Sequence, residues 1–346
     1  MSEPPLILNG RARGRVTVRG VERWAREVIP RLLALRPERY IAIDPPPGFA
    51  DWPGQAWEQL VLPARAWRRR AALVFSPANL APGLWPRNVV VVHDVAVLRN
   101  PRAYSRPYRE WHARVGLECA RRALRVVTVS EFSRAELVAL AGLDPDRVVV
   151  IRGGVDARFS PSADHERVAS RYGLDRPYVL TVGTADRRKN LSVLDETARR
   201  LDGIGMQLVW AGAARQHIRA TPALDSLRAL GYVTEPDLPG LYAGARAFVL
   251  PSLYEGFGLP CIEAMACGTP VVASDRSGLP EACGDAALLV DPRERRAVAE
   301  AVVKAATDTA LRADMRARGL LQSAAMSWER TAHELDALLT GLADSR

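Results

Sequence analysis

Short apolar runs recur along the whole chain, and longer amphipathic or polar stretches separate them. The runs lie at residues 6–9, 40–43, 73–75, 89–92, 126–130, 148–151, 178–183, 208–212, 230–233, 247–250, 271–273 and 287–290. Runs of this length, alternating with segments long enough for a helix, are typical of buried strands joined by crossover connections. The pattern therefore predicts an α/β fold built on parallel sheets.

Helices are predicted where apolar positions recur with the helical period. Three clear cases are residues 20–35, 104–124 and 311–346, the last of them broken near 326–329. Residues 45–64 are rich in proline, glycine and tryptophan, and this composition predicts a loop.

A polar, irregular stretch at residues 159–176 is typical of a linker. A chain of 346 residues is long enough for two α/β domains. We therefore expect a first domain at 1–158 and a second at 159–328.

Charge is distributed unevenly between these two halves. The formal net charge is +9, and residues 1–158 carry 26 arginines, no lysine and 15 acidic residues, against 22 basic and 24 acidic residues in 159–346. We expect the basic half to meet something anionic, such as a membrane surface or a diphosphate-linked lipid. Nucleic acid fits less well, because no helix-turn-helix, zinc or RNA-binding signature is present. An arginine-rich surface exposed only to solvent is the alternative.

Aromatic and cationic residues gather at 57–70, where Trp57, Trp67 and the run Arg68–Arg70 lie. Such a combination suits a membrane interface. It equally suits a solvated helix whose tryptophans pack inward, so the sequence leaves both interpretations open.

The four cysteines, at 119, 261, 267 and 283, have neither CxxC nor zinc-site spacing, which fits core thiols in a reducing cytosol. No stretch approaches the roughly 20 apolar residues of a membrane helix, and the first apolar run is too short for a signal peptide. We expect a cytoplasmic location, with peripheral contact to the inner face of the cytoplasmic membrane as a further option. Asp144 and Asp146 have the Asp-x-Asp spacing of some metal sites, but they lie in a predicted turn between a helix and a strand. We therefore expect no catalytic metal, and we expect no cofactor.

The stretch 251–274 combines the strongest local signals. An apolar run precedes it, a loop with Gly256 and Gly258 follows, and Pro260 and Gly268 suit the beginning and end of a helix. Strand, loop and helix in this order bring the helix N-terminus to the carboxyl edge of a parallel sheet, where α/β folds bind ligands. Free N–H groups at that terminus suit a phosphate.

Two carboxylates accompany this loop, Glu255 within it and Glu263 on the following helix. Carboxylates beside a phosphate site would repel the phosphate unless they face sugar hydroxyls, which they accept well. The stretch therefore predicts a site for a diphosphate with a sugar on either side. An ordinary strand–loop–helix turn with two surface glutamates is the alternative.

Two more candidates follow strand ends. Arg188 and Lys189 come shortly after the strand at 178–183 and before a helix, which suits a diphosphate. His93 follows the strand at 89–92 and therefore faces the ligand-binding edge of its sheet. A structural histidine is the alternative at this position.

The stretch 251–274 resembles the Glu-x7-Glu signature of retaining GT-B glycosyltransferases of family four. The likeness extends to Gly20–Arg23, to Gly153–Asp156 and to the Val-Gly-Thr-x-x-x-Arg-Lys-Asn segment at 182–190. It implies two Rossmann-like domains facing across a cleft, with a C-terminal helix at about 329–346 that crosses back to the first domain.

The resemblance also implies which residues act. It implies four catalytic residues: Glu255, His93, Arg188 and Lys189. It implies nine donor-binding positions: Gly20, Thr184, Tyr232, Val233, Gly256, Phe257, Gly258, Leu259 and Glu263. In that scheme the cations and glycine N–H groups bind the diphosphate, and Glu263 holds the ribose. Glu255 holds the transferred sugar, the backbone at 232–233 reads the base, and His93 contacts the donor sugar or the acceptor.

The finer likeness is to mannosyltransferase-like members that build bacterial polysaccharides. It implies a GDP- or UDP-linked nucleotide-sugar donor, with GDP-mannose favoured, and a glycan or polyprenyl-diphosphate-linked acceptor. It also implies transfer with retention and without a metal. Alternatives are a GT-B nucleotide-sugar epimerase and a non-catalytic nucleotide-sugar-binding protein. A dehydrogenase fits less well, because Gly10 and Gly14 do not form a dinucleotide fingerprint.

Overall fold

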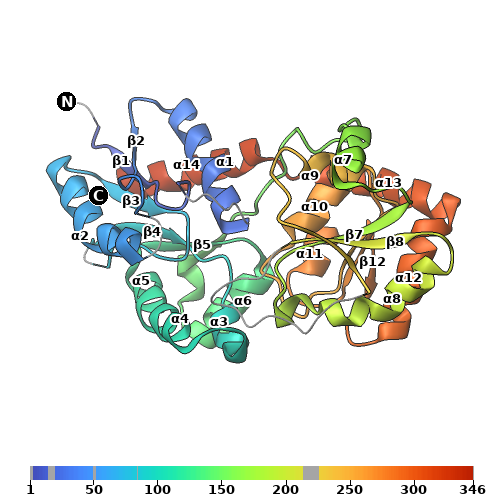
Figure 1. Cartoon of the computed structure of the whole chain (residues 1–346). Coiled ribbons are helices and arrows are strands. Elements are labelled where there is room, and N and C mark those ends of the chain that lie inside the picture. The colour runs from blue at the N-terminus through green and yellow to red at the C-terminus, as the bar shows by residue number, and fades with distance from the viewer. Residues whose placement is uncertain (1–2, 15–19, 50–51, 84, 213–225, 346) are drawn as a thin grey trace. The chain divides into compact units, whose positions relative to one another are not determined.

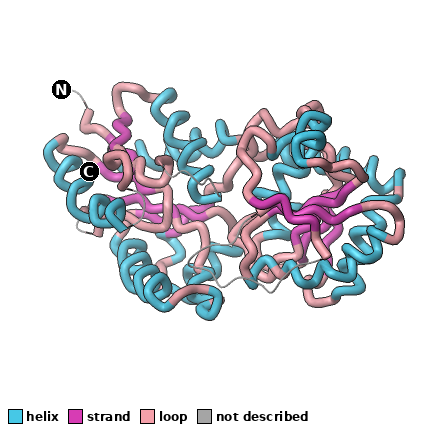
Figure 2. Tube along the Cα trace, viewed as in Figure 1, coloured by secondary structure: helices cyan, strands magenta, loops and turns pink. Residues whose placement is uncertain are grey.

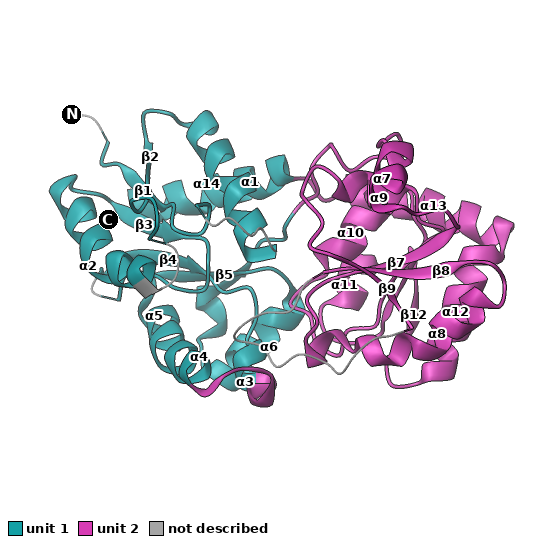
Figure 3. Cartoon of the chain, viewed as in Figure 1, with its two compact units in different colours: residues 1–98, 107–153, 328–346 teal, residues 99–106, 154–327 magenta. Residues whose placement is uncertain are grey.

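The computed structural model describes residues 3–14, 20–49, 52–83, 85–212 and 226–345 (Figure 1). The chain forms two compact units (Figure 3). Unit 1 comprises Met1–Leu98, Pro107–Gly153 and Trp328–Arg346, and unit 2 comprises Arg99–Arg106 and Gly154–Ser327. The chain thus passes briefly through unit 2 at Arg99–Arg106 and enters it again at Gly154, a few residues before the expected boundary at 158/159.

Unit 1 is built on a six-stranded parallel sheet. Its strands are β1 (Leu6–Asn9), β2 (Tyr40–Ile43), β3 (Leu73–Ser76), β4 (Asn88–Val91), β5 (Arg125–Thr128) and β6 (Val148–Val150), in the order β2-β1-β3-β4-β5-β6. Its helices are α1 (Gly20–Leu35), α2 (Trp52–Arg68), α3 (Ala96–Arg99), α4 (Arg106–Trp111), α5 (Leu117–Arg122), α6 (Glu131–Ala141) and α14 (Trp328–Asp344), with a π-helical turn at His112–Gly116. The strand order reverses between β1 and β3, which makes this the switch point of unit 1.

Unit 2 has a second six-stranded parallel sheet (Figure 2). Its strands are β7 (Tyr178–Val182), β8 (Gln207–Ala211), β9 (Arg228–Gly231), β10 (Ala247–Leu250), β11 (Val271–Ser274) and β12 (Ala287–Val290), in the order β12-β11-β10-β7-β8-β9. Its helices are α7 (His165–Tyr172), α8 (Asp195–Asp202), α9 (Leu238–Ala243), α10 (Leu259–Ala266), α11 (Leu279–Cys283), α12 (Arg295–Thr307) and α13 (Thr309–Ala324). This is the doubly wound order, with its switch point between β7 and β10.

The last helix belongs to unit 1, as expected. Trp328 of α14 lies edge-on against Trp24 of α1, with ring centroids 6.5 Å apart. Asp336 of α14 accepts hydrogen bonds from Arg36 Nε at 2.9 Å and from Tyr40 Oη at 2.8 Å. Burial, and then the Asp336 carboxylate, raise the pKa of Tyr40, so the phenol stays a donor. A helix contributed from the far end of the sequence is thereby fixed in the core of unit 1.

The loop predicted at 45–64 is wrong over most of its length, because α2 begins at Trp52. Pro53 lies in the first turn, where its missing N–H costs nothing, and Pro63 is accommodated inside the helix. Trp57, Leu62 and Ala66 pack into an apolar cluster with the sheet. This burial outweighs the helix-breaking residues, since tertiary packing routinely overrides local propensity.

Two other expectations about elements have clear outcomes. The strand placed at 230–233 lies earlier, because β9 ends at Gly231, where φ is +71°. The break near 326–329 is confirmed, since α13 ends at Ala324 and α14 begins at Trp328. None of the helices within the described ranges is long and apolar enough to cross a membrane.

Candidate functional site

The loops that follow β7 and β10 meet at the switch point of unit 2. The two strands are neighbours, with Val179 paired to Ala247 and Leu180 paired to Phe248. Parallel pairing places both carboxyl ends at one edge of the sheet, so residues 183–190 and 251–258 lie side by side there. The N–H group of Leu253 donates to the carbonyl of Arg188 at 2.7 Å and joins the two loops directly.

The loop after β7 begins with a glycine that leaves room for a lysine. Gly183 has φ near +150°, and a Cβ added there would lie 3.1 Å from Lys189 Cε. Asn190 follows in the left-handed conformation, and its Nδ2 donates to the carbonyls of Pro251 at 3.2 Å and Pro292 at 2.6 Å. The backbone and the Asn190 amide therefore hold Lys189 against the β10 loop.

Asp186 holds the loop that carries the two cationic residues, Arg188 and Lys189. Its side chain is fully buried and accepts from Thr184 Oγ1 at 2.8 Å, from the Arg188 N–H at 2.9 Å and from Arg188 Nη2 at 3.2 Å. Burial alone would raise the pKa of Asp186, but Arg188, Lys189 and these hydrogen bonds more than offset it and hold the pKa below its ordinary value. Asp186 is therefore ionised and fixes the direction of the Arg188 guanidinium.

Lys189 and Glu255 form an ion pair across the two loops. Lys189 Nζ lies 2.5 Å from Glu255 Oε1, and the side chains remain 12% and 15% exposed. Ser252 Oγ donates to the same carboxylate oxygen at 2.6 Å. A charged pair that keeps some exposure at a sheet edge can exchange partners with a bound ligand, whereas a fully sealed pair cannot.

A turn after β11 supports the backbone of the Glu255 loop. The Glu255 N–H donates to Ser277 Oγ at 3.0 Å, and the Gly278 N–H donates to the Glu255 carbonyl at 3.1 Å. Only glycine fits at 278, because an added Cβ would lie 2.4 Å from the Gly256 carbonyl oxygen. The backbone of Glu255 is thus held at both its N–H and its carbonyl, which fixes the position from which its side chain extends.

Helix α10 starts where this loop ends. Its first residue is Leu259, preceded by Gly258 at φ near +143°, and Pro260 lies in the first turn as expected. A Cβ on Gly258 would lie 2.8 Å from Leu279 Cδ2, so the backbone approaches α11 closely. The first N–H groups of a helix have no acceptor within it and favour an anion.

Glu263 lies further along α10 and is 3% exposed. The hydroxyl of the fully buried Tyr242, on α9, donates to Glu263 Oε2 at 3.0 Å. Tyr242 is itself fixed, because its carbonyl accepts from Thr269 Oγ1 at 2.7 Å and its ring packs on Phe248. The tyrosine therefore holds the Glu263 carboxylate in one orientation.

The structure brings together Thr184, Arg188, Lys189 and Glu255, and Gly256, Phe257, Gly258 and Leu259 continue the same loop into α10. Tyr232 and Val233 directly follow β9, with Tyr232 48% exposed and Val233 buried. Gly20 is the exposed first residue of α1, in unit 1.

His93 also lies in unit 1, two residues after the end of β4, and is buried. Its Nε2 lies 3.0 Å from the Pro77 carbonyl, its N–H donates to Asn79 Oδ1 at 2.8 Å, and its ring is edge-on to Trp24. Burial lowers the pKa of His93, and the hydrogen bond to Pro77 opposes that shift. The ring is therefore neutral, with its proton on Nε2, because the carbonyl can only accept.

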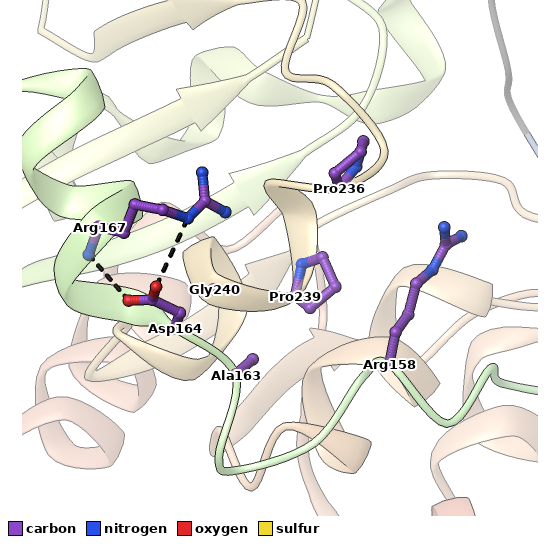
Figure 4. Close-up of a pocket in the computed structure, with 7 residues that line it drawn as sticks. All are labelled: Arg158, Ala163, Asp164, Arg167, Pro236, Pro239 and Gly240. Carbon is purple, nitrogen blue, oxygen red and sulfur yellow. Dashed lines mark hydrogen bonds and ion pairs between the residues drawn. The ribbon is translucent and has the colours of Figure 1, made fainter.

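A pocket of about 370 Å³ lies elsewhere in unit 2, lined by Arg158, Ala163, Asp164, Arg167, Pro236, Pro239 and Gly240 (Figure 4). Its cations are already neutralised. Arg167 Nη1 lies 3.0 Å from the buried Asp237 and Arg158 Nη2 lies 2.9 Å from Glu235. The pocket therefore offers little net charge to an anion.

Several residues of the site were missed from the sequence. Asp186 had a usable signal, since an aspartate whose side chain accepts from the N–H two residues on is a common turn. Ser277 and Tyr242 had none, because their partners lie on another loop or helix. Ser252 bonds to Glu255 three residues on in the same loop, a local contact that was not predicted. No group of three or more potential metal-ligating His, Cys, Asp or Glu side chains occurs in the part of the chain that the structure describes. Asp144 and Asp146 lie in a turn, as expected: Asp144 precedes the turn at Pro145–Arg147 and its side chain accepts from the Asp146 N–H.

Comparison with known proteins finds family models and relatives over most of the chain. A family model described as Glycosyltransferase Family 4 matches residues 16–159, and one described as Glycosyl transferases group 1 matches residues 163–321. The chain is 34% identical over 275 residues to O-antigen chain mannosyltransferase B of Escherichia coli, covering 73% of this chain and 70% of that protein. It is 30% identical over 275 residues to the serotype-specific mannosyltransferase WbdA of Escherichia coli, covering 74% of this chain but only 33% of that protein. Sucrose-phosphate synthase from Thermosynechococcus elongatus is similar in structure, with a TM-score of 0.79 at 20% identity, covering 99% of this chain and 100% of that chain.

Proposed function

This chain belongs to glycosyltransferase family 4 and has the GT-B fold, and on that premise we propose that it is a retaining mannosyltransferase that uses GDP-mannose. The proposed acceptor is a glycan or a polyprenyl-diphosphate-linked glycan. The choice of mannose is supported by the two Escherichia coli relatives, both of which are mannosyltransferases. A cytoplasmic site of action suits its four free thiols, all of them buried.

The observation that carries the proposal is the arrangement around Lys189. Lys189 and the oriented Arg188 lie beside Glu255, on loops that meet at the switch point and lead into the N-terminus of α10. A nucleoside diphosphate leaving group needs its growing negative charge stabilised more than it needs an acid. Two fixed cations and a helix N-terminus supply that stabilisation, so we expect no requirement for a divalent metal.

The two carboxylates would then accept hydrogen bonds from the sugar hydroxyls. Glu263, held by Tyr242, would accept from the ribose hydroxyls, and the backbone at Tyr232 and Val233 would contact the base. Glu255 would accept from the hydroxyls of the transferred sugar and stabilise positive charge near its anomeric carbon. We also propose Gly20 as a donor-binding residue and His93 as a catalytic residue, both in unit 1.

In the proposed reaction the bond between the anomeric carbon and the diphosphate oxygen breaks. The acceptor oxygen forms its bond on the same face of that carbon, and its proton passes to the departing phosphate oxygen. Paired hydrolase carboxylates would flank the reacting carbon. Here both glutamates lie on one loop and helix of one unit, so neither is placed as an obvious nucleophile opposite an acid.

The test is a thermal-shift screen of GDP-, UDP-, ADP- and dTDP-linked sugars, followed by a transfer assay with the stabilising donor. A donor at 100 times its Kd should stabilise the protein by about 2.7 kcal/mol. GDP-mannose should give the largest shift, transfer should survive EDTA, and the product should be the α-anomer of the α-linked donor. A larger shift with another nucleotide sugar would contradict the donor, and a β-linked product would contradict retention.

A further inference from the structure

Helix α2 lies in unit 1 (Figure 1), and its solvent-exposed face is unusually apolar. Leu60 is 66% exposed, Val61 is 38% exposed and Trp67 is 75% exposed. Single exposed apolar residues are normal on protein surfaces. Three large ones on one helix call for a physical account, because burying them would stabilise whatever state covers them.

The inner face of α2 is fixed, so the outer face cannot turn inward. Trp57, Leu62 and Ala66 are buried in the apolar cluster against the sheet. Glu58, 1% exposed, accepts from Asn9 Nδ2 at 2.5 Å and pairs with Arg11 Nε at 3.0 Å. The helix is therefore anchored along its length by apolar packing and by a buried ion pair.

The outer face is a continuous apolar stripe. Pro53, Ala56, Leu60, Ala64 and Trp67 are all exposed, and their spacing of three or four residues places them on one side of a helix. Surface helices usually carry polar residues there. On α2 the solvent-facing side is apolar instead, although the opposite side of the helix already packs on the core.

Cations gather at the C-terminal end of the same helix. Arg65, Arg68, Arg69 and Arg70 are all exposed, and none of them pairs with a carboxylate among the residues that the structure describes. Between residues 52 and 70 the one acidic residue is the buried Glu58. The exposed charge of α2 and its end is therefore entirely positive.

We propose that this face of α2 docks the chain on the surface of an anionic lipid bilayer. An exposed apolar stripe with a tryptophan, beside several arginines, matches a membrane interface: the apolar side chains enter the headgroup boundary and the guanidiniums bind lipid phosphates. The sequence left open whether Trp57 and Trp67 pack inward or face a membrane, and the structure gives a different answer for each. Trp57 packs inward at 3% exposure, whereas Trp67 faces out.

Sedimentation with vesicles tests this directly. The whole chain is mixed with vesicles of phosphatidylcholine, or of phosphatidylcholine with about one-third phosphatidylglycerol, at low and high ionic strength. Binding is expected to the anionic vesicles at low salt, with a strong reduction at high salt and on phosphatidylcholine alone. No activity is measured, so a failure here leaves the proposed mannosyl transfer untouched.

Variants test the apolar stripe and the arginines of this surface separately. Trp67→Ala should weaken partitioning about tenfold, the scale of burying one large apolar side chain. Changing Arg68, Arg69 and Arg70 together to Gln should weaken it about 100-fold, from roughly fivefold per arginine near an anionic surface. The matched controls are Leu321→Ser, a 75% exposed apolar residue on α13, and Arg296→Gln, an 82% exposed arginine on α12. Both controls should bind like the unmodified chain.

Three outcomes would overturn the docking surface. The first is no binding to anionic vesicles. The second is equal loss in Leu321→Ser and Trp67→Ala, which would mean a general apolar effect. The third is self-association in light scattering that Trp67→Ala abolishes without any vesicle binding, which would assign the stripe to a second copy of the chain. Circular dichroism confirms that each variant is folded.

Discussion

The two units share one architecture but use their switch points differently. In unit 1 the residues at that edge bind one another: Asn9 Nδ2 donates to Ser76 Oγ at 3.1 Å and to Glu58, which pairs with Arg11. All four side chains are at most 5% exposed. In unit 2 the Lys189–Glu255 pair stays 12–15% exposed beside a helix N-terminus.

The two switch points together show that strand order marks only where a ligand can bind. In unit 1 the Glu58 carboxylate of α2 reaches into the switch point, accepts from Asn9 and pairs with Arg11, and the resulting cluster is sealed from solvent. In unit 2 glycines at 183, 258 and 278 keep the backbone close and leave the charged side chains at the edge. Changes at the first cluster should therefore cost stability, and changes at the second should cost turnover.

The largest effect is expected for Glu58→Gln. Removing one charge of a sealed pair leaves Arg11 uncompensated and should lower the free energy of unfolding of unit 1 by about 3–5 kcal/mol. Scanning calorimetry measures the shift. The control is Glu118→Gln, which breaks the exposed pair with Arg122 and should change little. If both variants unfolded alike, the contrast between the two switch points would fail.

Lys189→Ala should leave the fold intact but lower mannosyl transfer roughly 100-fold or more, the scale of losing one transition-state charge contact. The chain has one other lysine, Lys304, exposed on α12, and Lys304→Ala is the matched control. Steady-state kinetics on both variants decides the matter. Turnover near that of the unmodified enzyme in Lys189→Ala would contradict the diphosphate assignment.

Glu255 and Glu263 should fail in different ways, each by about tenfold, the scale of one charged hydrogen bond. Glu255→Gln removes charge beside the reacting carbon, so kcat should fall with a smaller change in donor KM. Glu263→Gln weakens ribose binding in ground and transition state alike, so donor KM should rise with kcat nearly unchanged. Kinetics at saturating acceptor separates the two, and the opposite split would reverse the roles.

The smallest effect concerns pH and unit 1. Burial lowers the pKa of His93 below its ordinary value of 6.5, so the unfolded chain takes up this proton before the folded chain does. The contribution of neutral His93 to the free energy of unfolding is fully present above about pH 6.5 and is lost as the pH falls below that value. His93→Gln keeps a donor for Pro77, and its Tm should fall less between pH 7 and 5, by about 2–4 °C. Equal slopes would mean that His93 does not titrate in this range.

The sequence predicted local features well and long-range contacts poorly. The strands, the break before α14 and the proline at the start of α10 follow from neighbouring residues. The helix at α2 was missed because Pro53 and Pro63 suggest a loop until the burial of Trp57 is known. The Lys189–Glu255 and Tyr242–Glu263 contacts depend on which strands and helices become neighbours, and no local pattern encodes that.

Asn190 has a consequence for exchanging specificity between relatives. Its side chain joins the carbonyls of Pro251 and Pro292, and the neighbouring Arg188 carbonyl binds the Leu253 N–H. Segments 183–190, 251–258 and 277–292, the last of which contains Ser277, Gly278 and Pro292, therefore behave as one exchangeable module. A chimera that grafts only one of them from another family member would meet foreign backbone at each of these bonds, whereas a chimera that moves all three together would carry its own scaffold.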